Sequence, residues 1–290
     1  MTAVRLDLRP MDLGEILDRT FRLYRAYFMT FFLIMLTVQA VSFIGTLAWQ
    51  VQFVPMQTVR GGPAHVPGIG FFVALFLSLI VSFLATQVGI GTLTTAVSAI
   101  YLGEPIGIRE ALRRVRPILG RLLGTSLLTS LIVVLGFGAC LAPGVYFLLS
   151  YLLVSQVVVI EGLGPKAALK RSRELMRIKT DKGFFRNNVM KASVILIIVL
   201  VLAAAAGAIV SLPFGIAQVL MHDRSHPPSL LGPMQLLQQT LTMIIQAGVA
   251  PIGTIAMILF YYDIRIRKEG FDLQVLATAL GTEPVPPVHT

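Results

Sequence analysis

The sequence predicts an all-α, polytopic integral membrane protein: a bundle of about six transmembrane helices with three repeated units of an amphipathic helix plus a helical hairpin. Three observations indicate this fold class. Apolar residues make up 56% of the 290 residues, charged residues only 13%, and the mean hydropathy is +0.81, far from soluble composition. Several stretches reach the roughly 20 residues that a helix needs to cross a hydrocarbon core, without Asp, Glu, Lys or Arg. The charged residues gather in alternate loops between these stretches.

Six apolar stretches have the length and composition of membrane spans. Helices are the expected structure, because backbone polar groups in lipid must be satisfied within the segment and because the stretches lack the alternation of barrel strands. We expect one transmembrane domain over residues 1–282 and a disordered tail over 283–290. The predicted spans are residues 28–54, 71–101, 118–138, 144–160, 190–218 and 236–262.

Small residues and prolines predict details of these helices. Pro251 is expected to kink the sixth span because it removes one helical hydrogen bond, whereas Pro143 and Pro213 are expected to mark turns or helix ends. A stripe of small residues on the second span predicts that this helix is buried at the centre of the bundle. The stripe consists of Ser78, Ser82, Thr86 and Gly89.

Loop charge predicts the orientation in the membrane. One set of loops holds 22 of the 24 basic residues, since the other set contains only Arg60 and Arg224. The positive-inside rule places the basic set, and with it both termini, in the cytoplasm. The net charge of +10 then reflects topology and anionic headgroups, so we expect no nucleic-acid partner. The basic set comprises the residues before 28, 102–121, 161–191 and those after 262, and the exterior set comprises 55–70, 139–143 and 219–235.

A pattern recurs before the first, third and fifth spans. It consists of a leucine, a charged residue and a basic residue, followed four positions later by Leu or Ile. The spacing is identical in the three copies, which indicates three units of amphipathic helix plus hairpin. The copies are Leu17-Asp18-Arg19 with Leu23, Leu112-Arg113-Arg114 with Ile118, and Leu169-Lys170-Arg171 with Leu175.

These three segments place apolar residues on one helical face and basic residues on the other, as helices in a membrane interface do. Two interpretations stay open. The basic residues can simply anchor the orientation, or they can form a site for anionic lipid headgroups on the cytoplasmic face or for a protein partner. The candidates for such a site are Arg19, Arg22, Arg113, Arg114, Lys170, Arg171 and Arg173.

Four glutamines lie within the predicted spans. Gln39, Gln87 and Gln246 have similar estimated depths near the middle of the bilayer, whereas Gln156 lies closer to the cytoplasm. They can line one polar cavity, or they can form hydrogen bonds between helices, worth about 0.6–2 kcal/mol each.

The sequence contains no recognisable catalytic motif. A P-loop, a Gly-x-Ser-x-Gly elbow and a His-Glu-x-x-His motif are all missing, and no predicted span carries Asp, Glu, Lys or Arg away from its ends. The three loop histidines His65, His222 and His226 have no acidic or cysteine partner at metal-ligand spacing. We therefore expect no catalytic, cofactor-binding or metal site, and no cofactor.

Two stretches are similar to a known family. They are Leu13 to Tyr24 (LGEILDRTFRLY) and Tyr261 to Asp272 (YYDIRIRKEGFD), and both resemble the bacterial glycerophosphoryl diester phosphodiesterase membrane-domain family. The resemblance implies a multi-pass protein of the bacterial cytoplasmic (inner) membrane. In some relatives the domain precedes a phosphodiesterase barrel with a His-Arg pair. No His-Arg dipeptide occurs here, so the resemblance does not carry that activity over.

Packing of the two end motifs against each other would provide a partner for Asp263, which lies where the sixth span leaves the membrane. A carboxylate at a helix C-terminus is costly without a nearby cation, so we expect a structural ion pair between Asp263 and Arg19, or Arg22, of the opening segment. The alternative is a solvated Asp263 with only the arginines of its own tail nearby.

Three function classes follow from these observations. The sequence favours a non-enzymatic membrane module that associates with lipids or with a protein partner, because it has basic amphipathic helices and lacks reactive groups. A channel or transporter for a lipid or small solute is the alternative, because repeats often bracket a binding site. An intramembrane enzyme is the third class and has the weakest basis in the sequence.

Overall fold

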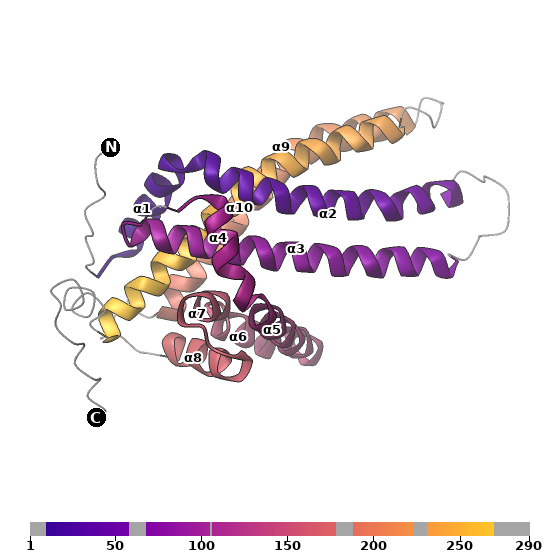
Figure 1. Cartoon of the computed structure of the whole chain (residues 1–290). Helices are drawn as coiled ribbons and strands as arrows, with labels where there is room; N and C mark the ends of the chain where they lie inside the picture. Colours follow the sequence, from indigo (N-terminus) through magenta and orange to yellow (C-terminus); the bar gives the residue numbers. More distant parts are fainter. Residues whose placement is uncertain (1–9, 58–67, 105, 178–187, 223–230, 270–290) are drawn as a thin grey trace. The chain divides into compact units, whose positions relative to one another are not determined.

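The computed structural model of the chain describes residues 10–57, 68–104, 106–177, 188–222 and 231–269, and the regular elements in these ranges are all helices (Figure 1). The predicted tail over residues 283–290 lies outside the described ranges. In chain order the helices are α1 (Leu13–Ala26), α2 (Phe28–Gln57), α3 (Ile69–Tyr101), α4 (Ile108–Val115), the 3₁₀ turn η1 (Arg116–Ile118), α5 (Leu119–Ala139), α6 (Leu141–Ser150), α7 (Val154–Glu161), α8 (Pro165–Arg177), α9 (Asn188–His222) and α10 (Leu231–Glu269).

Six helical segments of the described chain are long and apolar enough to cross a membrane. Each overlaps one span predicted from the sequence, so the expectation of six such segments is confirmed by length and composition. They are Phe28–Leu47, Ile69–Tyr101, Ile108–Ala139, Leu141–Glu161, Asn188–Leu220 and Pro233–Glu269.

The chain folds into two compact units. Unit 1 comprises residues 1–28, 91–197 and 252–290, and unit 2 comprises residues 29–90 and 198–251. Every Asp, Glu, Lys and Arg that the structure describes belongs to unit 1, and the described part of unit 2 has none. The two units therefore provide different chemistry, one ionic and one neutral. The expectation of a single domain stays a prediction.

In unit 1 the helices α5 to α8 pack against one another (Figure 1). The fourth predicted span is not one continuous helix, because it breaks at residues 151–153 between α6 and α7. The break leaves backbone carbonyls without helical partners, and α8 satisfies one of them: Ser172 Oγ donates to the carbonyl of Ser150 at 3.0 Å. The apolar face of α8 is buried, as its sequence pattern predicts. Its buried residues are Ala168, Leu169, Ser172, Leu175 and Met176.

One of the three prolines lies in a different part of its helix from the part predicted. Pro213 lies inside α9 and does not end it, which corrects the sequence-based expectation. Membrane helices tolerate internal proline because neighbouring groups satisfy the freed carbonyl. Pro143 lies in the first turn of α6, next to the α5–α6 turn, and Pro251 lies inside α10.

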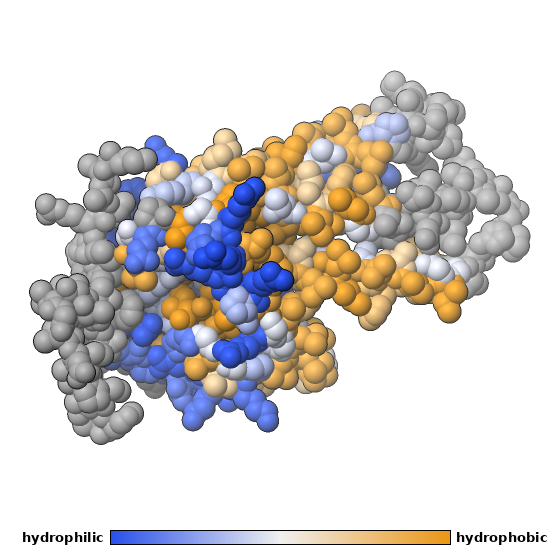
Figure 2. Space-filling model, in the orientation of Figure 1, coloured by the Kyte–Doolittle hydropathy of each residue, from blue (hydrophilic) through white to orange (hydrophobic). Residues whose placement is uncertain are grey.

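In unit 2 the helices α2 and α3 approach each other closely at two glycines, Gly45 and Gly89, which have no side chain to keep the helices apart. A Cβ atom added to Gly45 would lie 3.4 Å from Ser78 Cβ, and one added to Gly89 only 2.4 Å from Val38 Cγ2. The stripe of small residues predicted that α3 is buried at the centre of the bundle. Only part of this stripe is buried, since Ser78 is buried and Thr86 is exposed. The apolar side chains along the unit 2 part of α3 are largely exposed and form a face suited to lipid (Figure 2).

The three amphipathic segments form helices α1, α4 and α8, and each has its predicted apolar face partly buried. Ile16 and Thr20 of α1 and Ala111 and Val115 of α4 are buried, whereas Leu112 is 45% exposed. Their relation as copies of one repeated unit stays a prediction.

Candidate functional site

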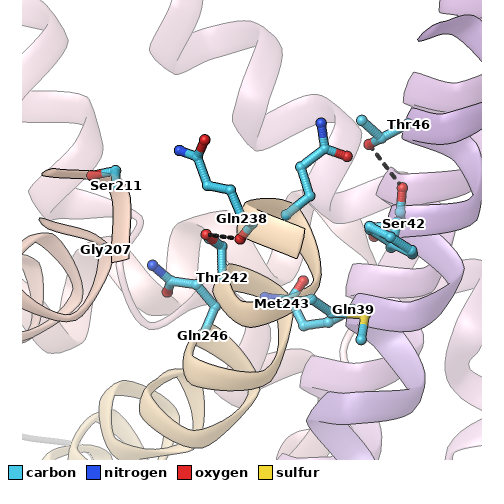
Figure 3. Close-up of a pocket in the computed structure, with 11 residues that line it drawn as sticks. Gln39, Ser42, Thr46, Gly207, Ser211, Gln238, Thr242, Met243 and Gln246 are labelled. Atoms are coloured by element: carbon cyan, nitrogen blue, oxygen red, sulfur yellow. Dashed lines mark hydrogen bonds between the residues drawn. The ribbon is translucent and has the colours of Figure 1, made fainter. Parts of the chain in front are cut away.

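A polar stripe crosses the otherwise apolar unit 2. Gln39, Ser42 and Thr46 on α2 are spaced by three and four residues and therefore share one helical face. Polar residues on α10 recur every fourth position, at Gln238, Thr242 and Gln246. Helix α9 contributes small residues at the same interval, Gly207 and Ser211. Figure 3 shows these side chains from the three helices around the same space.

Together they line an open cavity of about 460 Å³. This volume lies within the range of small-molecule sites. Apolar walls come from Phe43 and Met243, so that the cavity joins polar and apolar surface. The lining residues are Gln39, Ser42, Phe43, Thr46, Gly207, Ser211, Gln238, Gln239, Thr242, Met243 and Gln246.

Hydrogen bonds within unit 2 satisfy some of these groups. The hydroxyl of Thr46 donates to the Ser42 carbonyl at 3.0 Å, and that of Thr242 donates to the Gln238 carbonyl at 2.8 Å. These two hydroxyl oxygens still have lone pairs that can accept a hydrogen bond. The amide nitrogen of Gln246 donates to the carbonyl of Ala203 at 3.4 Å, at the long end of the range.

One polar atom in the cavity wall has no protein partner in the described part of the chain. This atom is Oε1 of Gln239, which is buried. A buried acceptor without a donor costs about 1–3 kcal/mol, so a donor that entered the cavity would recover that free energy. The cavity therefore offers hydrogen-bond acceptors and donors without charge.

The structure brings two of the four predicted glutamines together. Gln39 and Gln246 both line the cavity. Gln87 is also in unit 2 but is buried and does not line the cavity, and Gln156 belongs to α7 in unit 1. A cavity shared by all four glutamines was one of two open interpretations, and this cavity contains two of them. Estimated depth says nothing about which side of a helix a residue occupies, so a depth similar to that of Gln39 and Gln246 does not place Gln87 at the cavity.

Sequence reasoning missed most of the cavity wall. Gln238, Gln239, Thr242, Ser42 and Thr46 lie on the same faces as the two glutamines that were identified. Their spacing of three, four, seven or eight residues from Gln39 or Gln246 was readable as a helical stripe.

A buried ionic cluster joins the two ends of unit 1. Asp263 has no exposed surface, and its Oδ1 accepts from the backbone nitrogen of Met11 at 2.7 Å and from Nε of Arg267 at 2.9 Å. Its Oδ2 accepts from Nζ of Lys191 at 3.4 Å. The carbonyl of Met11 in turn accepts from Lys191 at 3.2 Å and from Arg267 at 2.7 Å. The segment before α1 is thereby bound to the end of α10.

Among the described residues, the cations paired with Asp263 are Lys191 and Arg267, and Lys191 lies where Arg19 was expected. Arg267 lies four residues further along the same helix and reaches the carboxylate directly. Arg19 is half-buried on α1.

A second ionic network lies nearby in unit 1. Arg171 contacts Glu161 at 3.1 Å and also pairs with Glu269, and Glu269 accepts from Nε of Arg265 at 3.0 Å. The hydroxyl of Tyr261 donates to Glu161 at 2.7 Å. Burial lowers the pKa of the Arg171 guanidinium, but the two carboxylates outweigh this effect and the pKa is raised. Arg171 is therefore a structural cation.

The basic residues proposed as a headgroup site divide into two groups. Arg171 and Arg173 point into unit 1, since Arg173 contacts the Tyr151 hydroxyl and lies 5.3 Å from the centre of its ring. Arg171 points inward because the carboxylates of Glu161 and Glu269 attract it. The others are more exposed. Arg22, Arg113, Arg114 and Lys170 are exposed and Arg19 is half-buried, with Arg113 and Arg114 both paired to Glu110.

Within the described ranges, no group of three or more His, Cys, Asp or Glu residues is placed to hold a metal ion. The single cysteine, Cys140, is exposed at the α5–α6 turn.

Comparison of the chain with protein-family models, curated proteins and solved structures finds no match. The family resemblance therefore rests on the two end motifs alone and stays a prediction.

Proposed function

We propose that the chain is a non-enzymatic membrane module that binds a membrane amphiphile with an uncharged, hydrogen-bonding headgroup in the unit 2 cavity. The observation that carries this proposal is the cavity wall: amides and hydroxyls from three helices, in a unit whose described residues have no Asp, Glu, Lys or Arg. A charged group in such a place would lack a counter-charge, whereas a neutral polyol or ester would find donors and acceptors.

The surroundings of the cavity favour an amphiphile over a water-soluble ligand. The outward side chains of α2, α3 and α9 in unit 2 include many exposed apolar residues, such as Ile44, Phe76 and Ile209. A membrane ligand would place its chains against such surface and its polar headgroup among Gln39, Thr242 and Gln246. A diacylglycerol, with one hydroxyl and two esters, has this chemistry.

The location and orientation are part of the proposal. The charge asymmetry of the loops and the two family-like end motifs support a bacterial inner membrane protein with its basic loops on the cytoplasmic side. The exposed basic residues Arg22 and Lys170 would then lie near anionic headgroups, where each basic residue contributes about 1 kcal/mol of attraction.

Photo-crosslinking tests the ligand site. The full chain in nanodiscs is exposed to a diazirine-labelled diacylglycerol, and the labelled peptides are identified by mass spectrometry. We expect labelling on α2 or α10 beside the cavity, and a loss of about two- to tenfold in Gln246→Leu and Thr242→Val, the effect of one hydrogen bond.

Thr86→Val is the matched control. Thr86 belongs to unit 2 and its hydroxyl donates to the carbonyl four residues earlier at 2.8 Å, as that of Thr242 does, but Thr86 does not line the cavity. Equal labelling of all variants, or an equal loss in Thr86→Val, contradicts the proposal.

Transport is the second candidate, because the cavity is built from helices that are long enough to span the membrane. Liposomes that contain the full chain would then move a fluorescent diacylglycerol analogue between leaflets faster than protein-free liposomes. Binding without accelerated movement favours the module, and accelerated movement that Gln246→Leu abolishes favours the transporter. An intramembrane enzyme has less support, since the cavity wall contains no acid, base or thiol.

A further inference from the structure

A second cavity lies in unit 1 and has ionic walls. Its volume is about 350 Å³, and residues of α3, α4, α7 and α10 line it together with the turn after α3. Its polar lining consists of Thr95, Ser98, Glu104, Arg114, Tyr262 and Arg265. Two guanidinium groups, one carboxylate and three hydroxyls therefore border one space.

The two arginines are held by carboxylates outside the cavity lining. Nε of Arg114 donates to Glu110 at 3.2 Å, and Nε of Arg265 donates to Glu269 at 3.0 Å. A guanidinium has five N–H donors, and the contact with Glu110 occupies only one of those of Arg114. Its terminal nitrogens have no partner in the part of the chain that the structure describes. They match the fork geometry that guanidinium groups use to bind phosphate oxygens.

Hydroxyls form another part of the wall. Ser98 and Tyr262 hydrogen-bond to each other, and the Tyr262 ring stacks on Tyr101 with 5.0 Å between ring centres. The hydroxyl of Thr95 donates to the carbonyl of Gly91 at 3.0 Å. This tyrosine pair is largely buried, so that side of the cavity is fixed by packing.

Glu104 provides a negative charge on the same cavity. Gly103 has a positive φ of 83°, which ends α3, and the backbone nitrogen of Glu104 donates to the carbonyl of Ala99 at 2.8 Å. The carboxylate of Glu104 is exposed and has no ion pair among the described residues. A positively charged N–H donor would satisfy it.

We propose that this cavity binds a zwitterionic phosphoester with a primary ammonium group, as in the headgroup of phosphatidylethanolamine. Arg114 and Arg265 hold the phosphate, the hydroxyls of Ser98 and Tyr262 border it, and Glu104 accepts hydrogen bonds from the ammonium. The cavity volume lies within the range of pockets that bind small polar groups. The inference does not depend on the unit 2 cavity, whose wall has no charge.

Headgroup preference is the measurable consequence. A quaternary choline group has the same charge but no N–H to donate, and a glycerol group has no positive charge. The site should therefore prefer phosphatidylethanolamine over phosphatidylcholine and phosphatidylglycerol with equal acyl chains. Native mass spectrometry of the full chain in detergent, titrated with each lipid, gives the bound fraction.

Two variants test the phosphate contact and the ammonium contact separately. We expect Arg114→Gln to weaken binding of all three lipids by about tenfold, the effect of losing a charge-assisted hydrogen bond. Glu104→Gln should remove the preference for phosphatidylethanolamine and leave binding of phosphatidylglycerol unchanged. Arg113→Gln is the matched control, because Arg113 pairs with the same Glu110 at 3.3 Å but is 81% exposed and does not line the cavity.

The results have definite readings. An equal loss in Arg113→Gln and Arg114→Gln overturns the proposal, since a diffuse basic surface would then bind the lipid. An unchanged headgroup preference in Glu104→Gln also overturns it. If both the preference and its loss are observed, competition with soluble glycerophosphoethanolamine distinguishes a lipid headgroup from a soluble phosphoester as the ligand. Displacement of the bound lipid at an equal concentration of the soluble compound assigns the site to a soluble phosphoester. The lack of displacement assigns the site to the lipid.

Discussion

Replacement of Asp263 by asparagine should destabilise the protein strongly. The side chain of Asp263 has no exposed surface, and that of its partner Lys191 is 6% exposed. An asparagine at this position would keep one of the two acceptor oxygens of Asp263 but would remove the negative charge that compensates the Lys191 ammonium. Breaking a buried ion pair from one side costs about 3–5 kcal/mol, because the remaining charge is left without compensation. We expect Asp263→Asn to lower the free energy of unfolding by that amount.

The contribution of the pair itself requires a double-mutant cycle with Lys191→Met. Removal of both charges leaves no uncompensated ammonium, so the double variant should be more stable than the sum of the single effects by about 0.5–3 kcal/mol. Unfolding of the full chain in mixed micelles, followed by far-UV circular dichroism during titration with sodium dodecyl sulfate, provides the free energies.

Asp18→Asn is the control for loss of a carboxylate in the same unit. Asp18 is exposed on α1, so its replacement should change stability by no more than about 0.5 kcal/mol. An effect of Asp263→Asn as small as that of Asp18→Asn, or additive effects of Asp263→Asn and Lys191→Met, refutes the reasoning.

Three further predictions concern topology, packing and the outer ion network. Cys140 is exposed, and the positive-inside rule predicts that its turn faces the outside, so it should react with a membrane-impermeant maleimide in intact cells; reaction only after lysis contradicts this orientation. Gly89→Ala should lower stability by about 1–3 kcal/mol in the same unfolding assay, since its Cβ would lie 2.4 Å from Val38 Cγ2, and Val38→Ala should restore most of the loss. Arg171→Lys should destabilise nearly as much as Arg171→Met, because an ammonium lacks the planar fork that contacts both Glu161 and Glu269; full stability of the lysine variant would contradict this.

Properties that depend on composition along the chain were predictable. The six apolar segments and the amphipathic character of α1, α4 and α8 follow from local patterns of hydropathy and charge. The burial of Asp263 with a cation was also predictable, because a carboxylate at the end of an apolar helix needs a partner.

The identity of partners was not predictable from local patterns. Lys191 is 72 residues from Asp263 in sequence, and only the packing of α9 beside α10 makes it the partner instead of Arg19. The break between α6 and α7 has no proline or glycine to signal it. Helix α8 compensates for part of it, since the Ser172 hydroxyl donates to the Ser150 carbonyl, which a continuous helix would have satisfied internally.

The separation of charge between the two units limits what each cavity can bind. In unit 2 the wall can form hydrogen bonds but cannot compensate a charge, so the loss of solvation would exclude an ion. In unit 1 the carboxylates Glu110 and Glu269 already hold the arginines in place, and a phosphate would enter a preformed ionic frame. Exchange of Gln246 for glutamate would therefore not create an ammonium site in unit 2. It would place a carboxyl group among neutral groups without a counter-ion, and such surroundings favour its neutral, protonated form.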